Sequence, residues 1–255
     1  MATEISRVDR SSMSSAEWEA RVKLAAAYRI AALEDCDDGV FNHFSLAVPG
    51  EPDHFLLKPF GPLFAEVTAS GLIKVDTDGK IVAGEGVWEP TAFFIHSRIH
   101  RSVPRAACIL HTHMPYASAI SSMADMRIRP VNQSSMRFIE RTAYLEDYGG
   151  LVLDDDEANK VVDALSEFDI LLMANHGAMV IDETVEGCVF DLHYLEWACR
   201  DQYRLYASGQ TPRMIPEDVI ARTAGQMVDE KRMAKEAHFA AMCRRLDREI
   251  PGYDQ

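Results

Sequence analysis

Two histidines at the end of an apolar segment have the spacing that points most directly to chemistry. Residues 107–113 read Ala-Cys-Ile-Leu-His-Thr-His, so one residue separates His111 from His113. Side chains alternate between the two faces of a β-strand, and both rings would therefore project from the same face. Two neutral imidazoles on one face can take adjacent positions on Zn²⁺, Mn²⁺ or Fe²⁺. The pair is either part of a metal site or two ordinary polar residues at a strand end.

Two further segments place polar side chains beside predicted strands. His176 lies in Asn175-His176-Gly177, directly after the apolar run 170–174. The end of a strand is where functional residues often gather, although a structural role for His176 remains open. Asn42 and Ser45 lie near the start of another predicted strand, after Asp38-Gly39. Their alternative role is a turn held by side-chain hydrogen bonds to the backbone.

The elements that must position these residues are short strands interleaved with helices. Several strands are close neighbours in sequence, as hairpins require, which favours one α/β domain with a mixed or largely antiparallel sheet. Residues 1–13 are predicted to be a loose N-terminal segment and 14–255 a single domain. Strands are predicted at 44–48, 55–58, 73–75, 80–82, 106–113, 151–153, 170–174 and 178–181, and helices at 15–35, from Pro90 to before Pro104, and at 116–123, 155–167, 184–207 and 216–246.

Composition and charge restrict the classes of partner. The 255 residues include 26 Lys and Arg against 40 Asp and Glu, a formal charge of −14. Nucleic acid and anionic membranes need a basic face, so a small-molecule substrate is the expected partner. No apolar stretch reaches about 18 residues, so no transmembrane helix is expected, and the first residues do not predict a signal peptide. Five scattered cysteines without a C-x-x-C pattern indicate reduced thiols and a cytoplasmic location.

Taken together, the three polar segments resemble the class II aldolase/adducin family. The likeness extends over residues 16–253 and includes Leu57-Lys58-Pro59-Phe60-Gly61, Ile73-Lys74-Val75-Asp76 and Ile95-His96-Ser97-Arg98-Ile99-His100. The resemblance implies a three-layer α/β/α fold with a central, mainly antiparallel sheet. It also implies a homo-oligomer, commonly a tetramer, with active sites between subunits. By the motif, His111, His113 and His176 are the three ligands of a divalent metal, zinc first and manganese or iron as alternatives.

The substrate side of the motif is only partly present. The resemblance assigns substrate binding to Asn42, Ser45, Lys58 and Gly61. The small hydroxyl residue that usually precedes the glycine is replaced by Phe60, which argues against a phosphorylated sugar. Lys58 is expected either to pair with a substrate carboxylate or to extend into water.

The glutamate that transfers a proton in the family's sugar-phosphate aldolases is also missing. Ala92 occupies its position, and Glu89 lies three residues earlier. Glu89 is the candidate acid/base, with a first-turn helix acid as its alternative role. His96 and His100 lie four apart on one helix face, where we expect buried, hydrogen-bonded histidines rather than a second metal site.

These features predict a metal-dependent carbon–carbon lyase. Such a decarboxylase or aldolase would act on a small non-phosphorylated oxo or hydroxy acid chelated to the metal. One alternative is a non-haem iron oxygenase that cleaves a 2-oxo acid. The other is a non-catalytic, adducin-like scaffold, which the three retained histidines disfavour.

Overall fold

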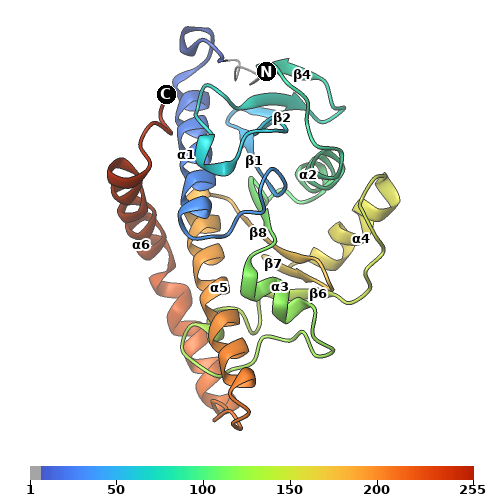
Figure 1. The fold of residues 1–255 in the computed structure, drawn as a ribbon, viewed down its shortest axis with the longest axis vertical. Helices are drawn as coiled ribbons and strands as arrows, with labels where there is room; N and C mark the ends of the chain where they lie inside the picture. The colour runs from blue at the N-terminus through green and yellow to red at the C-terminus, as the bar shows by residue number, and fades with distance from the viewer. Residues whose placement is uncertain (1–6) are drawn as a thin grey trace.

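A single eight-stranded sheet runs through the molecule (Figure 1). The computed structural model describes residues 7–255, apart from the side chains of 228–232. The strand order is β4-β3-β2-β1-β5-β8-β7-β6, and β6–β7 is the one parallel pair in the described part of the chain. The strands are β1 (His43–Val48), β2 (Glu51–Leu57), β3 (Ile73–Asp76), β4 (Ile81–Ala83), β5 (Cys108–Thr112), β6 (Thr142–Leu145), β7 (Ile170–Met173) and β8 (Gly177–Asp182).

Helices cover both faces of this sheet. On one face lie α1 (Ser15–Leu33), α3 (Pro115–Ser121) and α5 (Val185–Ala207), with α6 (Glu217–Glu249) packed against α1 and α5. On the other face lie α2 (Pro90–Ser102) and α4 (Asp155–Leu165). The predicted three-layer α/β/α fold with a mainly antiparallel sheet is therefore confirmed.

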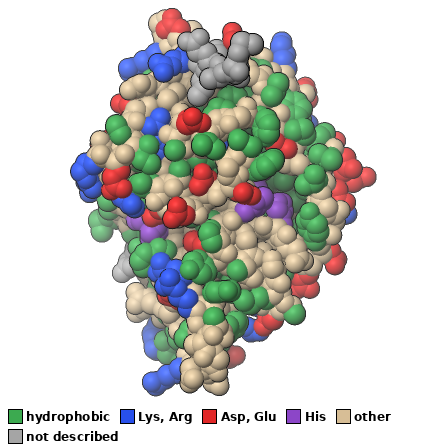
Figure 2. Space-filling model, in the orientation of Figure 1, with side chains coloured by type: hydrophobic (Ala, Val, Ile, Leu, Met, Phe, Trp, Pro, Cys, Tyr) green, Lys and Arg blue, Asp and Glu red, His purple; other side chains and the backbone are tan. Residues whose placement is uncertain are grey.

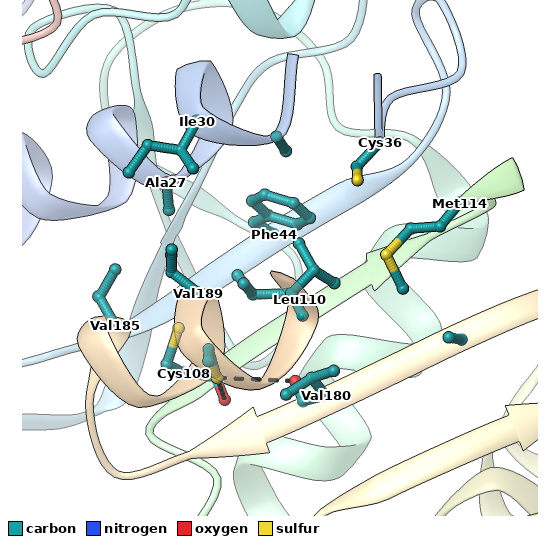
Figure 3. Close-up of a cluster of buried hydrophobic side chains, with 14 of the residues drawn as sticks. Ala27, Ile30, Cys36, Phe44, Cys108, Leu110, Met114, Val180, Val185 and Val189 are labelled. Atoms are coloured by element: carbon teal, nitrogen blue, oxygen red, sulfur yellow. Dashed lines mark hydrogen bonds between the residues drawn. The ribbon is translucent and has the colours of Figure 1, made fainter. Parts of the chain in front are cut away.

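Strand alternation divides the core into two layers. Leu110 of β5 points to the α1/α5 side, while its neighbour Ile109 packs with α2 and α4. Figure 3 shows Ile30, Phe44 and Val189 gathered around Leu110 in the larger layer. His111 lies two residues after Ile109 and so shares its face, the side covered by α2 and α4.

One predicted strand is wrong. Residues 151–153 form no strand, and β6 lies at Thr142–Leu145 instead, where it pairs in parallel with β7. Leu151 and Leu153 are exposed and only Val152 between them is buried. The apolar run Leu-Val-Leu indicated a buried strand, but it follows Gly149-Gly150 and forms an irregular segment just before α4, where Leu151 and Val152 line a cavity.

The N-terminal segment lies partly outside the described residues, which begin at residue 7. Within them, Arg10–Ser12 form a 3-10 helix, and the Val8 N–H donates to the Ser70 carbonyl at 2.9 Å. The loose segment 1–13 and the single domain 14–255 stay predictions. Among the described residues, every helix is too short or too polar to cross a bilayer.

Candidate metal centre

The sheet order brings together the three histidines that the motif singled out. His111 and His113 lie at the end of β5. His176 lies in the turn between β7 and β8, and β8 is the neighbour of β5 in the sheet. Their candidate ligand atoms all lie within 4.8 Å of one another. The ring centroids are 5.1 Å apart for His111–His113, 4.8 Å for His111–His176 and 4.9 Å for His113–His176.

Hydrogen bonds at the far side of two rings orient their free nitrogens. His111 Nδ1 donates to the Ala178 carbonyl at 3.0 Å, and His113 Nδ1 lies 2.9 Å from Asp38 Oδ2. Both contacts leave Nε2 available, and His113 Nε2 is buried without a hydrogen-bond partner. Carbonyl and carboxylate partners of this kind fix the tautomer of metal-ligating histidines. The donor set thus fits a divalent cation.

Burial keeps two of the three rings, those of His111 and His176, neutral. Desolvation, with the neighbouring histidines, holds the pKa of His111 well below its usual value. Desolvation and then His113 lower the pKa of His176 to about 4. A neutral imidazole carries the lone pair that coordinates a metal, so the electrostatics agree with the geometry.

Close backbone approach explains the Asn-His-Gly sequence. Asn175 adopts φ +55°, a left-handed conformation that asparagine tolerates better than most residues. A Cβ on Gly177 would lie 2.5 Å from the Thr112 carbonyl oxygen and 3.1 Å from His113 Cδ2. Glycine therefore allows the turn to close onto β5 and carries His176 to the other two rings.

A cavity of about 370 Å³ opens beside the cluster. In Figure 2, histidine atoms reach the surface near the middle of this face, flanked by acidic and hydrophobic side chains. Besides the three histidines, the wall consists of Asp38, Phe41, Asn42, His43, Glu89, Thr91, Ile95, Tyr148, Gly150, Leu151, Val152 and Asn175.

Asn42 is brought to the cavity, as predicted for a substrate-binding residue. Its Oδ1 accepts from the His113 backbone N–H at 3.1 Å, and its backbone has φ +64°. Its Nδ2 is buried and has no hydrogen-bond partner. An unsatisfied buried amide donor costs free energy unless a ligand pairs with it, so Nδ2 can bind a substrate oxygen.

Glu89 also lines the cavity, where it is the N-cap of α2. Its Oε2 accepts from the Ala92 N–H at 2.8 Å and from the Thr91 hydroxyl. The helix-capping role is therefore present, and the same carboxylate faces the cavity. Ala92, at the position of the family glutamate, is buried in α2.

Ser45, Lys58 and Gly61 are not brought to the cavity wall, so this geometry does not support a direct substrate contact from them. Ser45 is fully buried, with Oγ hydrogen-bonded to His96 and His100. Lys58 does not extend into water: its Nζ donates to the Val40 carbonyl at 2.8 Å, and burial lowers its pKa to about 8. Gly61 is exposed with φ +122°.

Sequence reasoning missed three residues of the cavity wall with ionisable side chains. His43 faces His111 across β1 and β5, and their ring centroids are 4.8 Å apart. The position of His43 in the sequence, between the predicted substrate-binding residues Asn42 and Ser45, could have indicated a place in the site. Asp38 was seen only as part of a turn. Tyr148, with its ring 6.4 Å from that of His176, lies in an irregular segment without any such signal.

The comparison with known proteins agrees with this architecture. The family described as Class II Aldolase and Adducin N-terminal domain matches residues 22–203. The chain belongs to this family. A Caulobacter vibrioides protein named for the class 2 aldolases is 34% identical over 243 residues, 94% of each chain. The crystal structure of an aldolase II superfamily protein from Pseudomonas syringae superposes with a TM-score of 0.91 at 37% identity, covering 96% of this chain and 99% of that one.

Two relatives from Streptomyces have names that specify reactions. Decarboxylase NovR of Streptomyces niveus is 30% identical over 191 residues, covering 74% of this chain and 70% of that protein. The 4-hydroxy-3-prenylphenylpyruvate oxygenase/4-hydroxy-3-prenylbenzoate synthase of Streptomyces roseochromogenus is 29% identical over 227 residues, 84% of this chain and 81% of that protein. Aldolase and decarboxylase relatives support a lyase-type enzyme, while the adducins are part of the same family.

Proposed function

We propose that this chain is a divalent-metal-dependent carbon–carbon lyase acting on a small non-phosphorylated oxo or hydroxy acid. The observation that carries the proposal is the cluster of His111, His113 and His176 beside a cavity. A divalent cation held there supplies Lewis-acid stabilisation of the electron pair left when a carbon–carbon bond breaks. Three imidazoles leave coordination positions open, as catalytic sites require.

The charge of the cavity wall supports a substrate without a phosphate group. Among the described residues that line it, none is Lys or Arg, and two, Asp38 and Glu89, are acidic. A phosphate dianion would find no cationic side chain there, whereas a carboxylate carries less charge to compensate. Apolar side chains of Phe41, Ile95 and Leu151 form much of the remaining wall and suit a hydrocarbon or aromatic part of the substrate.

Two of the chain's own groups are proposed to handle the substrate. Asn42 Nδ2 donates a hydrogen bond to a substrate oxygen. Glu89 is the proposed proton-transfer group, because Asp38, the other carboxylate in the wall, is already bonded to His113. After loss of CO₂ or of an aldehyde, the carbon that keeps the electron pair must receive a proton, which Glu89, Tyr148 or water can supply.

Metal content tests the proposal. We expect about one metal ion per subunit in the wild type by elemental mass spectrometry, with zinc expected first, and below about a tenth of that in a His111→Ala/His113→Ala variant. His54→Ala is the matched control, because His54 is a half-exposed histidine of β2 that pairs with Glu51. Metal retained by the double variant, or a wild type that stays empty after reconstitution, would contradict the proposal. An empty wild type would favour the scaffold alternative.

A second candidate reaction is oxidative. The named Streptomyces oxygenase is a relative over most of this chain, and a three-histidine site can hold Fe²⁺. Oxygen uptake coupled to loss of an oxo acid, with iron as the bound metal, would favour this reading. Turnover of the same acid without oxygen would favour the lyase.

A further inference from the structure

A short turn directly before β1 makes several of the contacts that shape the metal centre. Asp38 and Phe41 pair across it, and the Phe41 N–H donates to the Asp38 carbonyl at 3.0 Å. Asp38, Phe41 and Asn42 all line the cavity. Asp38 also bonds the ring of His113, while Asn42 accepts from the His113 backbone N–H. We call residues 38–42 the site turn, and its conformation therefore influences the orientation of His113.

The backbone of the site turn needs support from outside. Gly39 and Asn42 have left-handed φ values of +57° and +64°. Glycine adopts this conformation at little cost, whereas asparagine keeps it only where the surrounding structure offsets the cost. A Cβ on Gly39 would meet no atom of the described chain within 4 Å beyond its sequence neighbours, so side-chain packing does not hold the tip of the turn.

Lys58, directly after β2, provides that support. Its side chain is buried, and its Nζ donates to the carbonyl of Val40, in the middle of the site turn, at 2.8 Å. The Lys58 backbone is itself fixed, because its N–H donates to the buried Tyr28 hydroxyl at 3.3 Å. The same hydroxyl accepts from the Phe44 N–H of β1 at 2.8 Å. The lysine side chain thus reaches the turn from a backbone that is tied to the neighbouring strand.

We propose that Lys58 is a positioning residue for the metal centre. Its amino group holds the site turn at the Val40 carbonyl, and the turn holds His113 through the side chains of Asp38 and Asn42. A buried lysine is costly unless its head group is hydrogen-bonded, which favours the closed turn over a loosened one. Lys58 then acts on the site without touching the substrate. The effect on metal binding rests on the proposed function, whereas the effect on the turn does not.

Hydrogen–deuterium exchange of the metal-free protein tests the effect on the turn. Lys58→Met removes the amino group and keeps a long, unbranched side chain. We expect peptides covering 38–43 and 112–114 to exchange about tenfold faster than in the wild type, because the hydrogen bonds of the turn open more often. A peptide from the middle of α5 measures global unfolding in each sample, and rates are compared after that correction.

Lys74→Met is the matched control. Lys74 is a partly buried lysine of β3 that pairs with Glu17 and Glu51, away from the site turn. Its loss should leave the corrected exchange of both peptides at the wild-type rate. Lys58→Leu, which also lacks the amino group and is smaller, serves if Lys58→Met does not fold.

Zinc affinity, measured by competition with a chromophoric chelator, tests the effect on the metal centre. We expect Lys58→Met to weaken zinc binding about tenfold and Lys74→Met to leave it unchanged. Asp38→Asn acts on the same ring of His113. In the Asp38→Asn/Lys58→Met variant, the loss should therefore be well below the product of the two single losses.

The outcomes separate this inference from the proposed function. Wild-type exchange of both peptides in a folded Lys58 variant would overturn the positioning role. Faster exchange with unchanged zinc affinity would overturn the link between the turn and the metal centre, and so would single losses that multiply fully in the double variant. If zinc does not bind to the wild type, the proposed function fails, but the exchange rates still show whether Lys58 holds the turn.

Discussion

In two of the three ligand histidines, His111 and His113, the second ring nitrogen has its own partner, and these partners orient the two rings. His113 depends on the side chain of Asp38, whereas His111 depends on a backbone carbonyl. A side-chain partner can be removed by substitution, so the contribution of orientation can be separated from that of the ligand itself. Asn42 adds a third interaction, because its Oδ1 accepts a hydrogen bond from the His113 backbone N–H.

Asp38→Asn should weaken metal binding about 10- to 100-fold while leaving the three ligands in place. The amide cannot reproduce the charged acceptor that holds the His113 ring. Competition with a chromophoric chelator measures the affinity. Glu89→Gln removes a carboxylate from the same cavity without touching a ligand, and should change the affinity far less. Equal losses in both variants would mean that cavity charge, and not ring orientation, controls binding.

Glu196 makes the stability of the protein depend on pH. Its carboxylate accepts from the N–H groups of Tyr116 and Ala117, at the start of α3, and burial raises its pKa from 4.5 to about 7. The folded state therefore binds more protons than the unfolded state between pH 4.5 and about 7. The stabilisation is complete below pH 4.5 and is lost as the pH rises to about 7.

We expect this one group to lower the free energy of unfolding by on the order of 2–3 kcal/mol across that window. Glu196→Gln should remove this part of the pH dependence, since an amide does not titrate there. Urea unfolding between pH 4.5 and 7.5 measures the slope in both proteins. A variant that keeps the wild-type slope would show that another group is responsible.

At the scale of elements, the turn between β7 and β8 is the most constrained part of the site. Gly177→Ala would place a methyl group 2.5 Å from the Thr112 carbonyl, in backbone that cannot move freely. We expect a loss of about 1–3 kcal/mol in stability and a matching loss of metal, because β8 must shift away from β5. Gly225→Ala in α6, where a Cβ meets nothing within 4 Å, should be neutral or slightly stabilising. Thermal melting measures the stability of both variants, and elemental analysis measures their metal content. A Gly177→Ala variant with wild-type stability and a full complement of metal would contradict this prediction.

At the scale of the whole molecule, an apolar patch adjoins the cavity. Phe41, Phe60, Leu63 and Val87 are all exposed, the rings of Phe41 and Phe60 are 6.2 Å apart, and Phe60 N–H bonds the Val87 carbonyl. Exposed apolar clusters of this kind commonly mark protein interfaces. We therefore retain the proposal of a homo-oligomer, a tetramer with active sites between subunits, in which this patch is covered.

Light scattering after size exclusion should give about 114 kDa, four times the 28.5 kDa of one chain. Phe60→Glu should lower this mass, because a charge would be placed in a covered apolar contact. Val82→Glu, at an exposed position of the edge strand β4, is the matched control. A wild-type mass of one chain would exclude the tetramer.

The sequence by itself determined most of the elements, though not β6, and the local placement of the first two ligands. Hydrophobic alternation in residues 106–113 is a local property, and it placed His111 and His113 on one face. Turn and cap residues likewise placed α1, which begins after Ser14, whose Oγ accepts from the Glu17 N–H. The strand at 142–145 escaped prediction, because its four residues become a strand only through pairing with β7.

Only the tertiary structure decided which distant groups meet. His176 lies beside His111 because β8 pairs with β5. Ser45 forms hydrogen bonds with His96 and His100 and does not line the cavity. Lys58 is buried against a carbonyl, and His43 becomes part of the cavity wall. The physical reason is that strand order and helix docking are set by the summed burial of apolar surface over the whole chain. Local periodicity shows which face a side chain takes, and the packing of the complete sheet determines what lies opposite it.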